Sequence, residues 1–153
     1  MSNKSKLIAY WLSTGLFASA FLAGGIAELS SAPTATATAH ALGYPLYFLT
    51  ILGVWKLLGA AALLAPRLPL LKEWAYAGIF FDLTGAAASH AASGDAAGKV
   101  ATPLVFLLLA AASWALRPSA RRLKSASTLA QSAQDRATRE DAAAPQPFAR
   151  PNA

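Results

Sequence analysis

The stretch GVWKLLGAAALL, residues 53–64, is apolar throughout except for one charged side chain. It belongs to an apolar run over residues 44–65 whose only ionic side chain is Lys56. A run of about 20 apolar residues is long enough for an α-helix to cross a bilayer. An ammonium group at the centre of such a helix lies about 15 Å from either interface, where an unpaired charge costs about 3 kcal/mol. The stretch therefore predicts a membrane helix whose lysine needs a partner.

The composition of the whole chain also indicates a membrane protein. Of its 153 residues, 56% are hydrophobic and only 13% are charged, roughly half the charged share of a soluble domain. The chain has no cysteine, which excludes disulfides and thiol redox chemistry carried by this chain. The net charge of +6 does not indicate nucleic acid, because the positive residues gather at the ends of apolar segments.

Four apolar segments predict an all-α membrane protein, a bundle of four transmembrane helices over residues 7–28, 44–65, 73–92 and 100–117. These helices form a membrane domain over residues 1–118. Residues 119–153 are rich in Ala, Ser, Gln and Pro and contain few large apolar side chains. They predict a disordered, basic cytoplasmic tail, with at most a short surface helix around residues 121–134.

Lysine and arginine predict the orientation of the bundle. Eight of them lie before the first helix, between the second and third, and after the fourth, whereas the other two loops contain only Lys99. The positive-inside rule then places both termini in the cytoplasm of a multi-pass protein of the bacterial inner membrane. Residues 1–39 also offer a second interpretation as a cleaved signal peptide, although their apolar core exceeds the usual 7–15 residues.

The third segment offers a partner for Lys56. Asp82 lies eight residues into this segment, and a short turn joins it to the second, so the two helices are expected to run antiparallel with their midpoints at similar depth. An ion pair between Lys56 and Asp82 follows, because pairing removes most of the penalty of burying two charges. The alternative is a polar group that serves helix packing alone.

A second polar group is expected near the outer surface. Glu28 ends the first helix and His90 lies near the outer end of the third, so we predict that they approach one another across adjacent helices. The alternative is an interfacial cap and a packing histidine. Haem and metal are not expected, because His40 lies in a linker, no third histidine exists and no metal-ligand spacing occurs.

A family resemblance strengthens this interpretation. Residues 42–90 resemble the DoxX-like family of small four-helix membrane proteins through the Gly43-Tyr44-Pro45 start, Trp55-Lys56-Leu57, the run over residues 71–78, and Asp82 followed by Ser89-His90. Gly25 and Glu28 resemble the motif of the family's first helix. The resemblance covers residues 7–116. It implies a redox-linked membrane role, since the family takes its name from a small membrane subunit of a thiosulfate:quinone oxidoreductase.

The leading functional hypothesis is a polar bundle interior that binds a small molecule, with a quinone as the candidate cofactor. In this hypothesis Lys56 donates hydrogen bonds, Asp82 holds its charge, and aromatic rings stack on the ligand. The expected partners are the lipid bilayer, soluble or membrane redox subunits, and a second copy of the chain. A proton-coupled transporter and a non-catalytic membrane anchor remain open, and no catalytic group is assigned. The candidate site residues are Glu28, Tyr44, Trp55, Lys56, Asp82 and His90.

Overall fold

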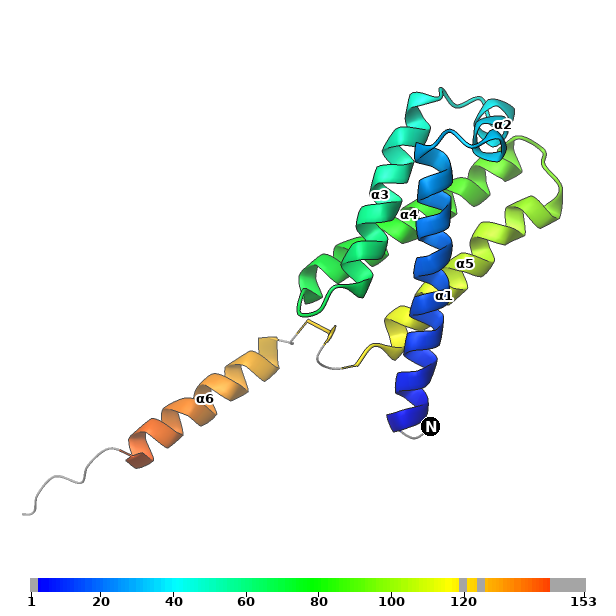
Figure 1. The fold of residues 1–153 in the computed structure, drawn as a ribbon. Helices are drawn as coiled ribbons and strands as arrows, with labels where there is room; N and C mark the ends of the chain where they lie inside the picture. The colour runs from blue at the N-terminus through cyan, green and yellow to red at the C-terminus, as the bar shows by residue number, and fades with distance from the viewer. Residues whose placement is uncertain (1–2, 119–120, 124–125, 144–153) are drawn as a thin grey trace, which may run out of the picture. The chain divides into compact units, whose positions relative to one another are not determined.

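The computed structural model describes residues 3–118, 121–123 and 126–143, and across them the chain forms helices joined by short connections (Figure 1). The residues fall into two units, Met1–Arg122 and Leu123–Ala153. The helices are α1 (Asn3–Leu29), α2 (Pro33–Ala41), α3 (Tyr47–Leu64), α4 (Pro69–Ala92), α5 (Ala97–Leu116) and α6 (Ala126–Ala143).

The predicted all-helical fold is confirmed, and the four predicted membrane helices correspond to α1, α3, α4 and α5. α4 begins earlier than predicted, because Pro69 occupies its first turn, where the missing N–H has no helical partner to lose. The sequence did not predict α2, which lies in the segment read as a linker. Pro33 starts this helix in the same way, and alanine alternates with threonine along it.

Three helices among the described residues are long and apolar enough to cross a membrane, over Lys4–Leu29, Tyr47–Leu64 and Ala97–Leu116. α4 is also long, at 24 residues, but it carries Lys72, Glu73 and Asp82. A helix of this length extends about 36 Å. The chain is therefore a helical membrane protein with at least these three apolar helices.

The long helices of the first unit surround a common core. α1 packs mainly against α3 and α5, and α4 packs mainly against α5 and α3. Figure 1 shows α1 crossing in front of α5 and α4. α1 and α4 therefore occupy diagonal positions, and the prediction that the first and third membrane helices are neighbours was wrong. In a closed ring of four consecutive antiparallel helices, the third always lies opposite the first.

The centre of this core joins apolar packing to a buried chain of hydroxyl groups. The rings of Phe17 and Phe21 contact one another at a tilt, with centroids 4.6 Å apart, and pack with Leu63, Ile79 and Leu83. Next to them, the hydroxyl of Ser113 on α5 lies 2.6 Å from that of Thr14 on α1 and 2.7 Å from that of Tyr76 on α4. These hydrogen bonds tie three helices together where water has no access.

The crossing of α1 and α3 depends on two glycines. A Cβ added to Gly53 would lie 2.7 Å from Cγ of Leu29 and 2.9 Å from the carbonyl oxygen of Gly25. Membrane helices approach closely where such small residues meet. Gly24 on α1 and Gly59 on α3, by contrast, both face open space.

We predict that Gly53→Ala destabilises the bundle by roughly 1–3 kcal/mol, the usual cost of overpacking a filled interface. Thermal unfolding of the detergent-solubilised protein measures the effect. Gly59→Ala on the same helix is the matched control, because its added methyl group meets no atom within 4 Å. Equal melting temperatures for the two variants would contradict the close crossing.

Cationic side chains close the opposite end of the bundle from Glu28. Lys72 is fully buried and donates hydrogen bonds to the carbonyl oxygens of Ala62 at 2.7 Å, Leu63 at 2.8 Å, and Ala65. These carbonyls lie at the C-terminal end of α3, where no N–H group of a following helical turn can donate to them. A residue that the sequence placed in a cytoplasmic loop thus caps α3 from inside the protein.

Arginines after α5 support the same end. Arg117 forms an ion pair of 2.9 Å with Glu73 and lies over the ring of Tyr76. Arg121 donates to the hydroxyl of Tyr10 and to the carbonyl oxygen of Leu63, both at 3.2 Å. The basic cluster after the fourth membrane helix is therefore partly structural.

The second unit contains α6, in the segment for which the sequence predicted a disordered tail with at most a short surface helix around residues 121–134. The side chains of residues 128–140 are all exposed, so this part of the helix has no buried face. Alanine, the residue with the highest helix propensity, makes up six of its 18 residues and favours helix formation without tertiary contacts. The parts of the predicted tail at 119–120, 124–125 and 144–153 lie outside the described residues.

Candidate ligand-binding site

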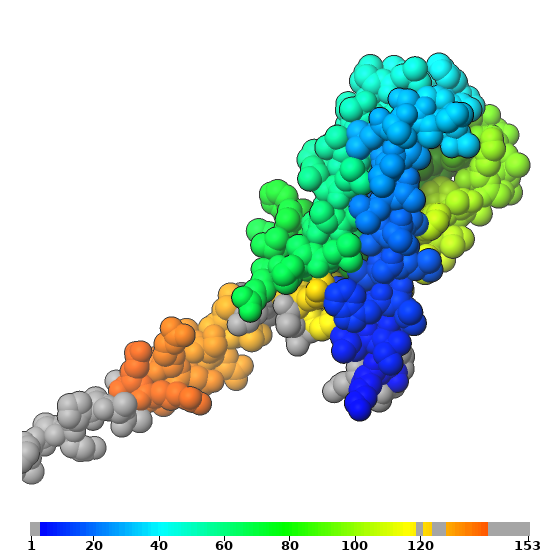
Figure 2. Space-filling model, in the orientation of Figure 1, coloured from blue at the N-terminus to red at the C-terminus, as the bar shows by residue number. Residues whose placement is uncertain are grey.

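A cavity of about 460 Å³ lies between α1, α2, α3 and α4, at the end of the bundle where α1 stops. Small residues on the two diagonal helices leave this space: a Cβ at Gly24 on α1 or at Gly85 on α4 would meet no atom within 4 Å. α2 covers the cavity with Thr34, Thr38 and Ala39. Figure 2 shows α1, α2 and α3 as a continuous surface on this face.

Three charged side chains from three helices meet at the inner end of the cavity. Nζ of Lys56 on α3 donates a hydrogen bond to Oε1 of Glu28 on α1 and lies 4.0 Å from Oδ2 of Asp82 on α4. The side chains of Lys56, Glu28 and Asp82 are 18%, 13% and 19% exposed, so solvent screens them little. The same ammonium group lies 5.8 Å from the ring centre of Phe21, which adds a cation–π contact.

The predicted partner of Lys56 was Asp82, but the hydrogen bond goes to Glu28. Asp82 lies within ion-pair distance at 4.0 Å, beyond hydrogen-bond reach. Gly25 explains the choice, because Cβ of Lys56 lies 3.2 Å from the position that a Cβ on Gly25 would occupy. The missing side chain lets the lysine run along α1 as far as the carboxylate of Glu28.

Glu28 and His90 both line the cavity but do not pair with one another, contrary to the prediction. Nδ1 of His90 lies 2.8 Å from Oδ2 of Asp95, and Lys99 donates to Oδ1 of the same carboxylate at 2.7 Å. The hydrogen bonds from His90 and from Lys99 lower the pKa of Asp95. The loop between α4 and α5 thus supplies a partner for His90 five residues away, while Lys56 already occupies Glu28.

Tyr44 lies at the mouth of the cavity, in a short chain of hydroxyl groups. The hydroxyl of Ser89 donates to the carbonyl oxygen of Gly85 at 2.9 Å, so its single proton is used. Tyr44 therefore donates to Ser89, at 2.7 Å. Its ring stacks on that of Phe48 with centroids 4.9 Å apart, and both rings form part of the wall.

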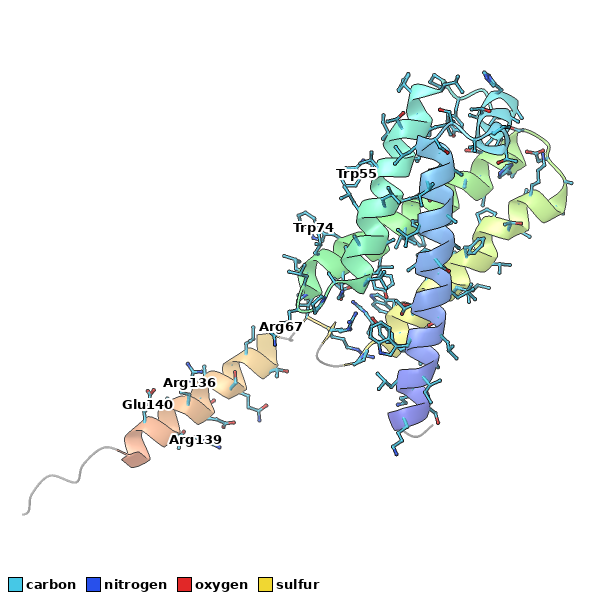
Figure 3. The ribbon with its side chains drawn as sticks, viewed as in Figure 1. Trp55, Arg67, Trp74, Arg136, Arg139 and Glu140 are labelled. Atoms are coloured by element: carbon cyan, nitrogen blue, oxygen red, sulfur yellow. The ribbon has the colours of Figure 1, made fainter. Side chains whose placement is uncertain are left out.

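Trp55 does not belong to this cavity. Its side chain is 68% exposed and projects from α3 away from the bundle, as Figure 3 shows. Five of the six candidate residues therefore line one cavity, and the sixth lies on the outer surface of α3. Sequence reasoning missed the threonines of α2 and the role of Asp95 as the partner of His90. It noted Ser89 beside His90 in the family motif but did not include it among the candidate site residues.

The charges of the cavity are not balanced. Two carboxylates share one ammonium group, and Oε2 of Glu28 is buried without a hydrogen-bond partner among the described residues. Lys56 has three N–H donors and uses one on Glu28. The site can therefore donate to a ligand through Lys56 and accept a proton or hydrogen bond at Glu28 or Asp82. In the described part of the chain, no three His, Asp or Glu side chains converge as metal ligands.

The helices and the cavity together define a multi-pass membrane protein with a polar, ligand-sized cavity inside its helical bundle. The sequence model of the DoxX-like family matches residues 12–113, which covers most of α1 to α5. The chain belongs to the DoxX-like family, as the resemblance of residues 42–90 predicted. No curated protein and no solved structure matches it.

Proposed function

We propose that this protein binds a small ring-bearing molecule of the quinone class in the cavity between α1, α2, α3 and α4, as a membrane component of a redox-linked complex. The observation that carries the proposal is the meeting of Lys56, Glu28 and Asp82 at the inner end of a cavity of about 460 Å³. Its volume falls within the range of roughly 300–1,000 Å³ typical of small-molecule sites.

The chemistry of the cavity supports a quinone head group. A quinone carbonyl accepts a hydrogen bond, which the unused N–H groups of Lys56 can donate. A quinol hydroxyl donates one, which the unpartnered Oε2 of Glu28 can accept. Tyr44 and Phe48 add two stacked aromatic rings to the wall of the same cavity. Each redox state thus finds a complementary group, Lys56 for the quinone and Glu28 for the quinol.

Filling the cavity tests the proposal without removing a charge. Gly85→Leu places a large apolar side chain in open space between α1 and α4. We expect the purified protein in nanodiscs to bind decylubiquinone, and Gly85→Leu to weaken that affinity about tenfold or more, the scale of blocking part of a hydrophobic site. Intrinsic tryptophan fluorescence or equilibrium dialysis measures the binding.

Gly15→Leu is the matched control, because Gly15 is exposed on α1, faces open space and lines neither this cavity nor its neighbours. Its affinity is expected to equal that of the unaltered protein. A protein that binds no quinone would sink the proposal. Substrate flux in proteoliposomes that stops on Asp82→Asn would then favour a proton-coupled transporter, and absence of both activities would favour a membrane anchor.

The proposal includes a topology of four spans with both ends in the cytoplasm of a bacterial cell. α3 and α5 are each long enough to cross the membrane, and α4, a helix of 24 residues joined to both through short connections, returns across it in this proposal. Lys99, in the first turn of α5, is the single lysine or arginine between Lys72 and Arg117. Because lysine and arginine gather on the cytoplasmic side of membrane proteins, this asymmetry supports an inner position for both termini.

Reporter fusions test this topology. Fusions after Ala39 and Asp95 are expected to report the outer side of the membrane, and fusions after Leu70 and Ser119 the inner side. The control is a fusion at Lys4, which must agree with the fusion after Leu70. A cytoplasmic signal after Ala39 would show that α1 does not cross, and the cavity would then not open to the outer side.

A further inference from the structure

A second cavity lies on the other side of Lys56. Its volume is about 430 Å³, and it is a groove between α3 and α4. Apart from Lys56 and Asp82, every residue that lines it is apolar or glycine. Leu52, Lys56 and Asp82 line both cavities, so the polar cavity and the groove meet at the charged group.

Two glycines produce the width of the groove. Gly59 on α3 and Gly78 on α4 both line it, and a Cβ at either position would meet no atom within 4 Å. This differs from Gly25 and Gly53, where the absence of side chains brings two helices together. The glycines of the groove hold space open, and nothing in the described residues of the bundle fills it.

The groove runs along a helix that is long and apolar enough to cross the bilayer. It follows α3 from Lys56, near the middle of that helix, toward its end. Trp55 and Trp74 line it and project outward from α3 and α4, as Figure 3 shows. The medium around a membrane-spanning helix is acyl chains, so a groove that is apolar apart from Lys56, Asp82 and two indole N–H groups suits an apolar chain.

We propose that the ligand is an amphiphile dissolved in the membrane, whose polar head occupies the cavity beside Lys56 and whose long apolar chain leaves through the groove between α3 and α4. This inference rests on the proposed function and adds the substrate class and the route of access. Lys56 and Asp82 mark the boundary between head and chain, because they are the only charged residues that line the groove. The ligand reaches the site sideways from the lipid.

The test compares two quinones that share a ring and differ in the chain. Decylubiquinone carries an alkyl chain, and its chain-free parent quinone does not. Gly78→Leu and Gly59→Leu fill the groove from opposite walls and leave the polar cavity unchanged. In nanodiscs we expect each variant to weaken the affinity for decylubiquinone about tenfold or more, and to leave the affinity for the chain-free quinone unchanged. Comparing variants cancels the different partitioning of the two probes into lipid.

Gly15→Leu controls for the general effect of an added leucine, and the melting temperature of every variant reports whether it is folded. Equal losses for both quinones, or no loss for either, would overturn the groove as the chain site while leaving the head-group site intact. If the unaltered protein binds neither quinone, the proposed function fails and this inference fails with it. Two variants on opposite walls guard against a single misfolded protein.

Discussion

Lys56→Met is expected to destabilise the folded bundle by about 3–5 kcal/mol, the usual cost of breaking a buried ion pair by removing one partner. The substitution leaves the carboxylates of Glu28 and Asp82 facing one another across a poorly solvated space, without their shared cation. Methionine has nearly the length of lysine, so lost packing contributes little. Thermal unfolding in detergent and the yield of folded membrane protein measure the loss.

The structure also predicts which second change restores stability. Glu28 accepts the hydrogen bond and Asp82 lies 4.0 Å away, so Glu28→Gln should recover more of the loss in the Lys56→Met background than Asp82→Asn does. Lys6→Met, at an exposed position of α1, is the control and should leave the melting temperature unchanged. Purely additive effects of the paired changes would show that the three side chains do not interact.

Lys72→Met is expected to have a comparable effect at the other end of the bundle, about 3 kcal/mol, on the scale of leaving buried polar groups without partners. Lys72 is fully buried, and the carbonyl oxygens of Ala62, Leu63 and Ala65 accept its hydrogen bonds. Removing the ammonium group takes this donor away from the carbonyl oxygens of Ala62 and Ala65 and leaves that of Leu63 with Arg121 alone. The measurement is again the melting temperature, with binding of decylubiquinone as a second readout.

A larger cation should not replace Lys72. The guanidinium group of arginine needs more room than a fully buried site provides, so Lys72→Arg is also expected to lower the melting temperature. Lys4→Met, on an exposed part of α1, supplies the control. Because Lys72 lines neither cavity, the folded fraction of Lys72→Met should bind quinone normally. A Lys72→Met protein as stable as the original would mean that water reaches these carbonyls.

The helices were predictable because each is encoded locally. The apolar runs of α1, α3 and α5 satisfy the length requirement of the bilayer by themselves, and residues 42–90 also carry the family resemblance. The short helix α2 was not predicted, and α6 was anticipated only as a short surface helix around residues 121–134. Both lack an apolar stripe, which is the signal that sequence periodicity detects.

The sequence predicted which residues form the candidate site better than it predicted which of them pair with one another. Counting residues from the helix ends predicted similar depths for Lys56 and Asp82, and in the structure both belong to one charged group. The same count placed Glu28 near the outer surface, as a partner of His90. It did not allow for the length of the Lys56 side chain, which extends several ångströms along α1. The close contact of α1 and α3 at Gly25 and Gly53 directs this side chain toward Glu28.

The amino-acid sequence alone predicts a helical membrane protein with charges inside its bundle, because the hydropathy of one helix reflects the free energy of moving that helix out of water. The tertiary structure adds which charges meet and where α2 lies. It also shows that Gly59 and Gly78 hold a groove open, while Gly25 and Gly53 bring α1 and α3 into close contact. These outcomes depend on the rotation and spacing of helices distant in sequence. The role of each glycine therefore depends on which residues of the neighbouring helix lie next to it.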